Sequence, residues 1–258
     1  MSSFADHFST TAAAYAAYRP HYPDTLFAWL ASVAPTRDRV WDCGTGSGQA
    51  AIGLAAYFGH VVATDPSAAQ LSRAERDARV SYAAMTAERS ALLSHSAALV
   101  TAAQALHWFD RDAFYAEARR VLVPGGLLAV WSYALGTFSE PALDEALRRF
   151  YEETVGPFWP PERSIIEDGY RSLELPFDEL EPPDVVMEAT WTLDQLAGYL
   201  STWSAVQRAR IATGNDPLPD FLRVLAQRWG ANVESRTIRW PLAIRVGRTG
   251  LHAATATR

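Results

Sequence analysis

Residues 40–49 of this 258-residue chain, Val-Trp-Asp-Cys-Gly-Thr-Gly-Ser-Gly-Gln, constrain its fold more than any other stretch. The Val-Trp pair is typical of the end of a buried strand. Three glycines at alternate positions then allow sharp turns and a close approach of the backbone to a ligand: Gly44, Gly46 and Gly48. Residues 49–56 can begin a helix directly afterwards. A strand, a glycine loop and a helix in this order predict a nucleotide-binding corner at the carboxyl end of a parallel sheet.

The acidic residue before the glycine loop, Asp42, distinguishes between two classes of nucleotide. Residues 46–51 also fit the fingerprint G-x-G-x-x-A of nicotinamide- and flavin-binding enzymes, whose pyrophosphate a carboxylate would repel. S-adenosylmethionine has no phosphate but carries an ammonium and a sulfonium group, which an acid at the end of the first strand suits. The order D-x-G-x-G-x-G therefore favours S-adenosylmethionine, and an NAD(P)-dependent Rossmann oxidoreductase is the alternative.

A second acidic residue, Asp65, ends the apolar run of residues 61–65. A carboxylate at the end of the second strand can accept hydrogen bonds from both ribose hydroxyls of an adenosine cofactor. Pro66 follows it and is placed to touch the adenine face. Asp65 can equally cap the helix that begins near Ser67, so its position alone does not decide between a binding role and a structural one.

Several further segments match one family in residue type and spacing: residues 15–23, 42–48, 86–88, 103–109, 122–126 and 202–207. On these segments the chain resembles the class I S-adenosylmethionine-dependent methyltransferases, and more narrowly the trans-aconitate methyltransferase-like group of small-molecule enzymes. The resemblance implies an α/β fold with a doubly wound, seven-stranded, mostly parallel sheet and a lid insertion after the fifth strand. It also implies methyl transfer by SN2 displacement, with S-adenosylmethionine as the cofactor and no metal.

The motifs and the resemblance together give a set of cofactor-binding residues: Tyr18, Arg19, Asp42, Gly44, Gly46, Gly48, Asp65, Pro66, Thr86, Ala87, Glu88 and Gln104. Arg19 can pair with the cofactor carboxylate through two parallel hydrogen bonds. Otherwise it forms a surface ion pair of little consequence.

His107 is the candidate catalytic base, because it follows the fourth strand, where donor and acceptor should meet. A role in fixing the loop is equally open. A pocket for the acceptor is predicted from aromatic residues and one arginine: Trp108, Trp131, Tyr133, Trp203 and Arg208. A carboxylate acceptor needs no base, whereas an amine, thiol or phenol usually does. A carboxylate is slightly favoured, because the family resemblance points to acids and no second residue clearly orients His107.

Composition excludes several other classes. A net charge of −6 and a pI of about 5.5 argue against a nucleic-acid substrate. Cys43 is the only cysteine, so neither an intrachain disulfide nor a cysteine-based metal site is expected. No signal peptide or membrane span is evident, and we expect a cytoplasmic monomer or weak homodimer. A catalytically silent S-adenosylmethionine-binding protein is a further alternative.

The order of elements predicts a single methyltransferase domain over residues 1–258, with a helix and a lid insertion at about 134–183 and a part completing the sheet and pocket at 184–258. The expected strands are residues 39–43, 60–65, 79–85, 98–102, 127–131, 185–191 and 237–246. The expected helices are 22–34, 49–58, 67–77, 114–122, 140–154, 193–212 and 218–229. Residues 156–183 are rich in proline and are expected to be irregular.

Overall fold

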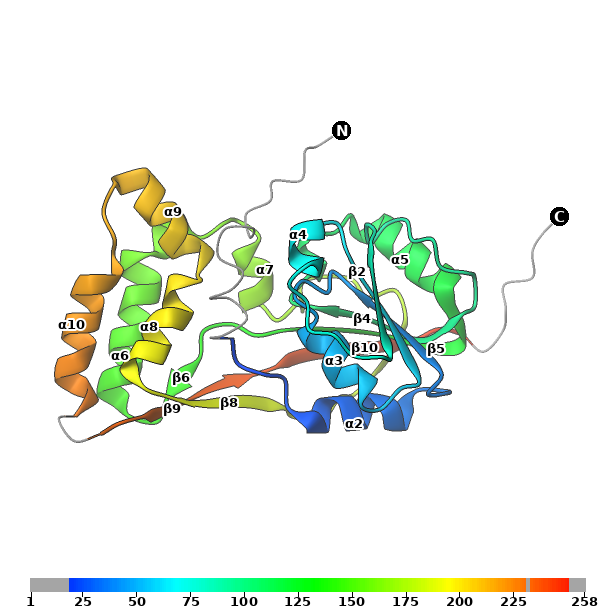
Figure 1. Ribbon diagram of the computed structural model, residues 1–258, viewed down its shortest axis with the longest axis horizontal. Coiled ribbons are helices and arrows are strands. Elements are labelled where there is room, and N and C mark those ends of the chain that lie inside the picture. The colour runs from blue at the N-terminus through cyan, green and yellow to red at the C-terminus, as the bar shows by residue number, and fades with distance from the viewer. Residues whose placement is uncertain (1–18, 231–232, 251–258) are drawn as a thin grey trace. The chain divides into compact units, whose positions relative to one another are not determined.

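The computed structural model describes residues 19–230 and 233–250 of the chain (Figure 1). The chain divides into two compact units, which are described separately. The sheet unit contains Tyr22–Tyr133, Asp168–Val185 and the described residues from Leu242 onward. The helical unit contains Ala134–Glu167, Val186–Pro241 and the described residues up to His21. Each unit is therefore built from separate stretches of sequence.

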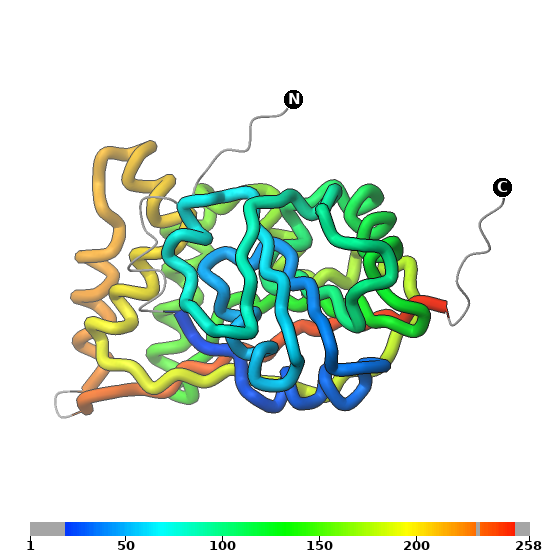
Figure 2. Tube along the Cα trace, turned by 45° about the vertical axis from the view of Figure 1, so that its right-hand side comes forward, coloured from blue at the N-terminus to red at the C-terminus, as the bar shows by residue number. Residues whose placement is uncertain are grey.

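The sheet unit is built on seven strands: β1 Arg39–Cys43, β2 His60–Asp65, β3 Val80–Ala84, β4 Ala97–Ala103, β5 Leu122–Ser132, β7 Asp178–Leu180 and β10 Ala243–Arg248. Their order is β3-β2-β1-β4-β5-β10-β7. The first five strands pair in parallel, and β10 runs antiparallel to both of its neighbours. Figure 2 traces β10, in red, among these strands. The predicted seven-stranded, mostly parallel sheet is confirmed.

Helices cover both faces of this sheet: α2 Asp24–Val33, α3 Gln49–Ala55, α4 Ala68–Leu71 and α5 Arg111–Val121. Side chains alternate between the faces along each strand. Val40 of β1 lies in one core cluster with the apolar residues of α2 and α3. The next residue, Trp41, faces the other way, and its ring centroid lies 6.3 Å from that of Phe114 in α5. The doubly wound arrangement follows from these two opposite faces.

The helical unit contains α6 Pro141–Arg149, a π-helical turn η2 Phe150–Thr154, η3 Gly156–Phe158, α7 Arg163–Glu167, α8 Leu193–Ser201, α9 Ser204–Thr213 and α10 Leu218–Trp229. It also has its own antiparallel sheet of three strands in the order β6-β9-β8, formed by β6 Thr137–Phe138, β9 Arg236–Pro241 and β8 Val186–Trp191. A capping box between Thr192 and Gln195 begins α8.

Two strand predictions are wrong. Residues 185–191 were expected to add the sixth strand of the large sheet, but β8 belongs to the three-stranded sheet. The sixth strand of the large sheet in chain order is β7. The single strand expected at 237–246 is two strands. Pro241 has no amide hydrogen to continue the ladder, and the amide of Leu242 donates instead to the Val185 carbonyl, 2.8 Å away. The chain thus passes from β9 in one sheet to β10 in the other.

Four other segments differ from the predictions. The helix expected at 193–212 is interrupted between α8 and α9, where the Thr202 hydroxyl donates to the Tyr199 carbonyl and Trp203 adopts extended backbone angles. The helix expected at 67–77 is the short α4, and β5 already begins at Leu122, before its glycine pair. Residues 156–183 contain η3, α7 and β7, so they are more regular than expected, and their role as a lid stays a prediction.

Candidate functional site

The glycine loop joins β1 to α3, and each of its three glycines has a positive φ: +67° at Gly44, +58° at Gly46 and +86° at Gly48. A Cβ on Gly44 would come within 2.7 Å of the Ala105 Cβ, and one on Gly48 within 2.3 Å of the Tyr82 hydroxyl oxygen. A Cβ on Gly46 would meet nothing within 4 Å. The outer two glycines are therefore required by packing, whereas the middle one presents bare backbone to open space.

Asp42 is fully buried at the end of β1 and is held by two hydroxyls. Thr45 Oγ1 donates to Asp42 Oδ2 at 2.5 Å, and Thr101 Oγ1 donates to Asp42 Oδ1 at 2.6 Å. Burial raises the pKa of Asp42 to about 6, although both hydrogen bonds act in the opposite direction. Near neutral pH the site therefore holds a poorly solvated negative charge, for which a cationic ligand group is the natural partner.

Sequence reasoning did not identify Thr101, although the chain carries a signal for it. Thr101 is a polar residue within the apolar strand β4, and it is the register partner of Asp42 in the neighbouring strand. Side chains of paired residues lie on the same face of a sheet. A hydroxyl at this position can therefore orient the carboxylate beside it.

Asp65 ends β2 and connects the glycine loop to the next helix. Its Oδ2 accepts from the Gly46 amide at 2.9 Å, and its Oδ1 accepts from the Ser67 amide at 2.8 Å. The side chain that caps α4 is that of Ser67, whose Oγ accepts from the Gln70 amide. Asp65 is therefore not the cap of α4. It fixes the open part of the glycine loop and lies beside it.

The segment after β4 lies directly against the glycine loop, because Ala105 and Phe109 are the neighbours that a Cβ on Gly44 would meet. Gln104 has a φ of +53°, which is uncommon for a residue with a side chain. Its Nε2 donates to the Tyr133 carbonyl at 3.0 Å, and its buried Oε1 has no hydrogen-bond partner among the described residues. This unmatched oxygen can accept a hydrogen bond from a ligand.

His107 lies in η1, a 3₁₀ turn at Leu106–Trp108, and is buried. Its Nδ1 is 3.1 Å from the hydroxyl oxygen of Tyr170, and the two rings are stacked with centroids 6.3 Å apart. The expectation that no second residue orients His107 is therefore wrong. Tyr170 was missed because 63 residues separate the two positions, and no local pattern marks the contact.

The other predicted residues of the sheet unit have varied surroundings. Pro66 and Thr86 are exposed and Ala87 is buried, while Glu88 is half-buried and its Oε1 accepts from the Asp110 amide at 3.1 Å. Trp108 is 43% exposed. Trp131 is fully buried in the core, with its ring 5.5 Å from that of Tyr22, and the buried Tyr133 also lies against Tyr22. Among these three aromatic residues, Trp108 is the one open to solvent.

The remaining predicted residues belong to the helical unit or lie outside the described residues, as Tyr18 does. The guanidinium carbon of Arg19 is 5.8 Å from the ring centroid of Tyr199. Trp203 lies in an aromatic cluster with four neighbours: Phe150, Tyr151, Trp159 and Tyr199. On α9, Arg210 pairs with Asp216 at 2.8 Å. Arg208 is half-buried and has no ion pair or hydrogen bond with any described residue.

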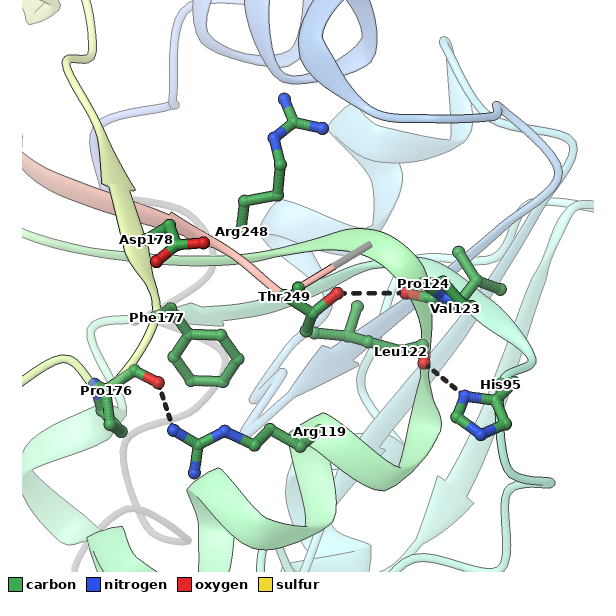
Figure 3. Close-up of a pocket in the computed structure, with 11 residues that line it drawn as sticks. His95, Arg119, Leu122, Val123, Pro124, Pro176, Phe177, Asp178, Arg248 and Thr249 are labelled. Carbon is green, nitrogen blue, oxygen red and sulfur yellow. Dashed lines mark hydrogen bonds between the residues drawn. The ribbon is translucent and has the colours of Figure 1, made fainter. Parts of the chain in front are cut away.

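A pocket of about 260 Å³ lies at the opposite, amino end of the parallel strands, where β5 begins (Figure 3). Its cationic groups are engaged in holding the chain. Arg119 donates to the Pro176 carbonyl, and Arg248 donates to the carbonyls of Gly125 and Val33 at 3.1 and 3.2 Å. His95 Nδ1 is 3.0 Å from the Leu122 carbonyl oxygen. This pocket is separate from the glycine loop and offers no comparable set of ligand-binding groups.

The residues around the glycine loop fit S-adenosylmethionine. Gly46 leaves space for a ligand against bare backbone, Asp42 offers a buried negative charge, and Gln104 offers an unmatched acceptor. Burial raises the pKa of the Cys43 thiol well above its usual value, which disfavours a nucleophilic role. Within residues 19–230 and 233–250, no cluster of His, Cys, Asp and Glu could hold a metal ion, and no helix is long and apolar enough to cross a membrane.

Comparisons with known proteins identify the family of the chain. A family model described as a methyltransferase domain matches residues 41–130. A "putative methyltransferase" of Dictyostelium discoideum is 33% identical over 231 residues, which cover 88% of each chain. A solved structure of a "putative type II methyltransferase" from Anaeromyxobacter dehalogenans is 46% identical with a TM-score of 0.86, over 92% of this chain and all of the other.

A more distant structure shares the fold alone. Phosphoethanolamine N-methyltransferase 2 of Haemonchus contortus, solved with phosphomonomethylethanolamine and S-adenosylhomocysteine, is 18% identical with a TM-score of 0.50. The match covers 97% of this chain and 61% of that protein.

Proposed function

Because this chain belongs to the class I S-adenosylmethionine-dependent methyltransferases, we propose that it methylates a small-molecule acceptor at a carboxylate oxygen. The buried Asp42 at the mouth of a glycine loop is the observation that carries the cofactor assignment. A dinucleotide would bring a pyrophosphate to this loop, next to a negative charge that is already poorly solvated. Neither an NAD(P)-dependent oxidoreductase nor a silent binding protein is favoured.

When bound, S-adenosylmethionine supplies a methyl group on a sulfonium, which is already activated for displacement. The residues of the chain then have to bind, orient and exclude water. Asp42 offers its charge to the cationic part of the cofactor, and Asp65 holds the Gly46 amide in place at 2.9 Å. Gln104 and His107 extend this surface along the segment after β4.

The choice of a carboxylate rests on one cationic side chain of the helical unit. In the helical unit, Arg208 is a half-buried cation without a described partner, whereas Arg210 on the same helix is neutralised by Asp216. A partly buried arginine gains most from a carboxylate, which it can hold with two parallel hydrogen bonds. The overall charge of −6 is unfavourable for a nucleic-acid substrate.

Calorimetry with S-adenosylhomocysteine and with NAD tests the cofactor first. We expect the former to bind and the latter to have no useful affinity; tight binding of NAD alone would refute the assignment. Release of S-adenosylhomocysteine is then measured over a panel of polycarboxylic acids and of the matching amides and alcohols. Turnover confined to the acids supports the proposal, and turnover confined to the alcohols refutes the carboxylate.

Two arginine variants on α9 provide a matched comparison. Arg208→Gln is expected to raise the KM for the acid acceptor about tenfold or more, as expected for one lost charge-assisted hydrogen bond. Arg210→Gln removes the same charge from a residue that is already paired with Asp216, and it should leave KM almost unchanged. Equal effects of the two variants would show that general surface charge, rather than a contact of Arg208, attracts the acceptor.

A further inference from the structure

Two threonine hydroxyls contact the buried carboxylate of Asp42 in the sheet unit. Thr101 Oγ1 lies 2.6 Å from Asp42 Oδ1, and Thr45 Oγ1 lies 2.5 Å from Asp42 Oδ2. Hydrogen bonds between neutral oxygens are usually about 2.7–2.8 Å long. Those from a hydroxyl to a carboxylate shorten to about 2.5–2.7 Å. Both distances therefore indicate an ionised Asp42, to which each hydroxyl donates.

The two hydroxyls come from different parts of the fold. Thr45 belongs to the glycine loop itself, whereas Thr101 lies in β4, which pairs in parallel with β1 and places Thr101 in register with Asp42. Thr101 is fully buried, and its β-branched side chain has few accessible rotamers. The pairing of two neighbouring strands therefore fixes the Thr101 hydroxyl against Asp42, independently of the glycine loop.

The charged and titratable groups around Asp42 offer it no positive charge. No basic residue of the described part of the chain is among the groups that act on its ionisation. Helix α3 and strand β4 contain no charged residue, and α2 contains one, the exposed Asp24. Asp65 at the end of β2 is a second acid and raises the pKa of Asp42 further. Burial raises the pKa of the Cys43 thiol, and it raises the pKa of Tyr82 on β3 to about 12, so both stay neutral near pH 7.

Burial and the two hydroxyls act on Asp42 in opposite directions. Burial raises its pKa to about 6, and the hydrogen bonds from Thr101 and Thr45 are the interactions that lower it. Without the Thr101 hydroxyl, the carboxyl group would keep its proton at a higher pH. A protonated Asp42 has to lose that proton before it can pair with a cationic ligand group. The hydroxyl of Thr101 therefore bears on binding as well as on packing.

We propose that Thr101 is a positioning residue whose hydroxyl keeps Asp42 ionised in the cofactor-free protein, and that cofactor binding releases to the solvent any proton that Asp42 still holds. This inference rests on the proposed function for the contact between Asp42 and the ammonium group of the cofactor. A hydroxyl in a neighbouring strand then sets the lower limit of the pH range in which the cofactor binds.

The ionisation of Asp42 can be followed by ¹³C NMR on the full-length, cofactor-free protein labelled at aspartate, with the Asp42 signal assigned by its loss in Asp42→Asn. Thr101→Val keeps nearly the same shape without the hydroxyl, and we expect Asp42 to titrate at a higher pH than in the wild type. Thr101→Ser keeps the hydroxyl and should restore the titration of the wild type. Thr101→Ala, which also lacks the hydroxyl, repeats the comparison with a smaller side chain.

The matched control is Thr64→Val on β2. Thr64 is also fully buried, but its Oγ1 accepts from Trp41 Nε1 at 2.9 Å and does not contact Asp42. This variant loses a buried hydroxyl and one hydrogen bond, so it should be less stable than the wild type. The titration of Asp42 should nevertheless stay as it is in the wild type.

Calorimetry with S-adenosylhomocysteine measures the link to binding, because its ammonium group is the cation that Asp42 would meet. We expect Thr101→Val to bind about tenfold more weakly than the wild type at pH 6.5 and almost equally well at pH 8.5. Titrations at pH 6 in two buffers of different ionisation enthalpy count the protons released. The wild type should release about half a proton and Thr101→Val nearly a whole one, whereas Asp42→Asn should release none.

Three results would overturn the proposal. The first is an identical titration of Asp42 in the wild type and in Thr101→Val. The second is a loss of affinity in Thr101→Ser as large as that in Thr101→Val, which would show that packing rather than the hydroxyl matters. The third is binding of S-adenosylhomocysteine at pH 6 without release of a proton. If S-adenosylhomocysteine does not bind at all, the proposed function fails, while the NMR titration still decides whether Thr101 keeps Asp42 ionised.

Discussion

Replacing the buried carboxylate with its neutral isostere, Asp42→Asn, is expected to stabilise the cofactor-free protein at alkaline pH. Burial raises the pKa of Asp42 from 3.8 to about 6, which corresponds to a penalty of about 3 kcal/mol on the charged form in the folded state. Asparagine keeps one oxygen to accept from Thr45 or Thr101, and the other hydroxyl can rotate to accept from the amide. The variant therefore loses the penalty on the charged form. Part of this gain is offset, because the second amide hydrogen and the hydrogen of the rotated hydroxyl lose the acceptors that the carboxylate supplied.

The sign of the pH dependence follows from the raised pKa. A carboxyl group whose pKa is higher in the folded than in the unfolded state contributes its full stability below pH 3.8. That contribution is lost as the pH rises through about 6. The difference in the free energy of unfolding, Asp42→Asn minus wild type, should therefore increase by about 2 kcal/mol between pH 4 and pH 8.

Urea unfolding of the cofactor-free proteins at pH 4, 6 and 8 measures this difference in the free energy of unfolding directly. Because all other titrating groups are the same in the two proteins, their contributions cancel when the two values are subtracted. In parallel, S-adenosylhomocysteine calorimetry at pH 8 should show affinity at least tenfold weaker in the variant, which loses a charge-assisted contact. A difference in the free energy of unfolding that stays constant with pH would refute the conclusion that Asp42 is a buried carboxylate with a raised pKa. Unchanged cofactor affinity would refute its role in binding.

Two further predictions concern the glycine loop and an ion pair of the sheet unit. Gly48→Ala should destabilise the fold by about 2 kcal/mol or more, because its Cβ would clash with Tyr82. Gly46→Ala should destabilise the fold by only about 1 kcal/mol, yet it should weaken S-adenosylhomocysteine binding at least tenfold. Thermal melts measure the stability of both variants and calorimetry their binding, and normal binding by Gly46→Ala would refute a ligand against that residue. The Arg120 guanidinium and Ser90 lower the pKa of Glu117 to about 2, so Glu117→Gln should destabilise the protein by about 1–2 kcal/mol at pH 7. In urea titrations, this difference should shrink as the pH falls from 4.5 towards 2, and a difference that persists at pH 2 would contradict it.

The arrangement around the glycine loop could be predicted from the sequence because its signals are local. The glycines, Asp42 and Asp65 lie within 24 residues of one another. Each of them lies at or next to the end of a strand, and the apolar residues of that strand predict it. Strand identity and the parallel order follow from the same short-range patterns. Long-range pairing is different in kind: β7 has only three residues and is a strand because β10 pairs with it.

The contacts around His107 could not be predicted, because they join distant residues. Nothing around Tyr170 in the sequence indicates His107, and nothing around Arg245 indicates the Tyr170 carbonyl to which it donates. The predicted pocket residue Trp131 is in the core, since a tryptophan within a buried strand and one beside a cavity look alike in a single sequence. Residues 185–191 were recognised as a strand, but the sheet that they join depends on which partner strand lies nearby.

The position of β10 within the sheet has a consequence for biosynthesis. β10 lies between β5 and β7, so β7, which is made more than sixty residues earlier, has no partner in the sheet until β10 has left the ribosome. The turn at Tyr170 depends on the same strand, because Arg245 of β10 donates to the carbonyls of Tyr170 and Leu173. The first five strands can assemble while translation continues, but the surface around His107 is completed only after synthesis is almost finished. A nascent chain released before Ala243 would therefore contain every residue of the cofactor loop and lack the support for Tyr170.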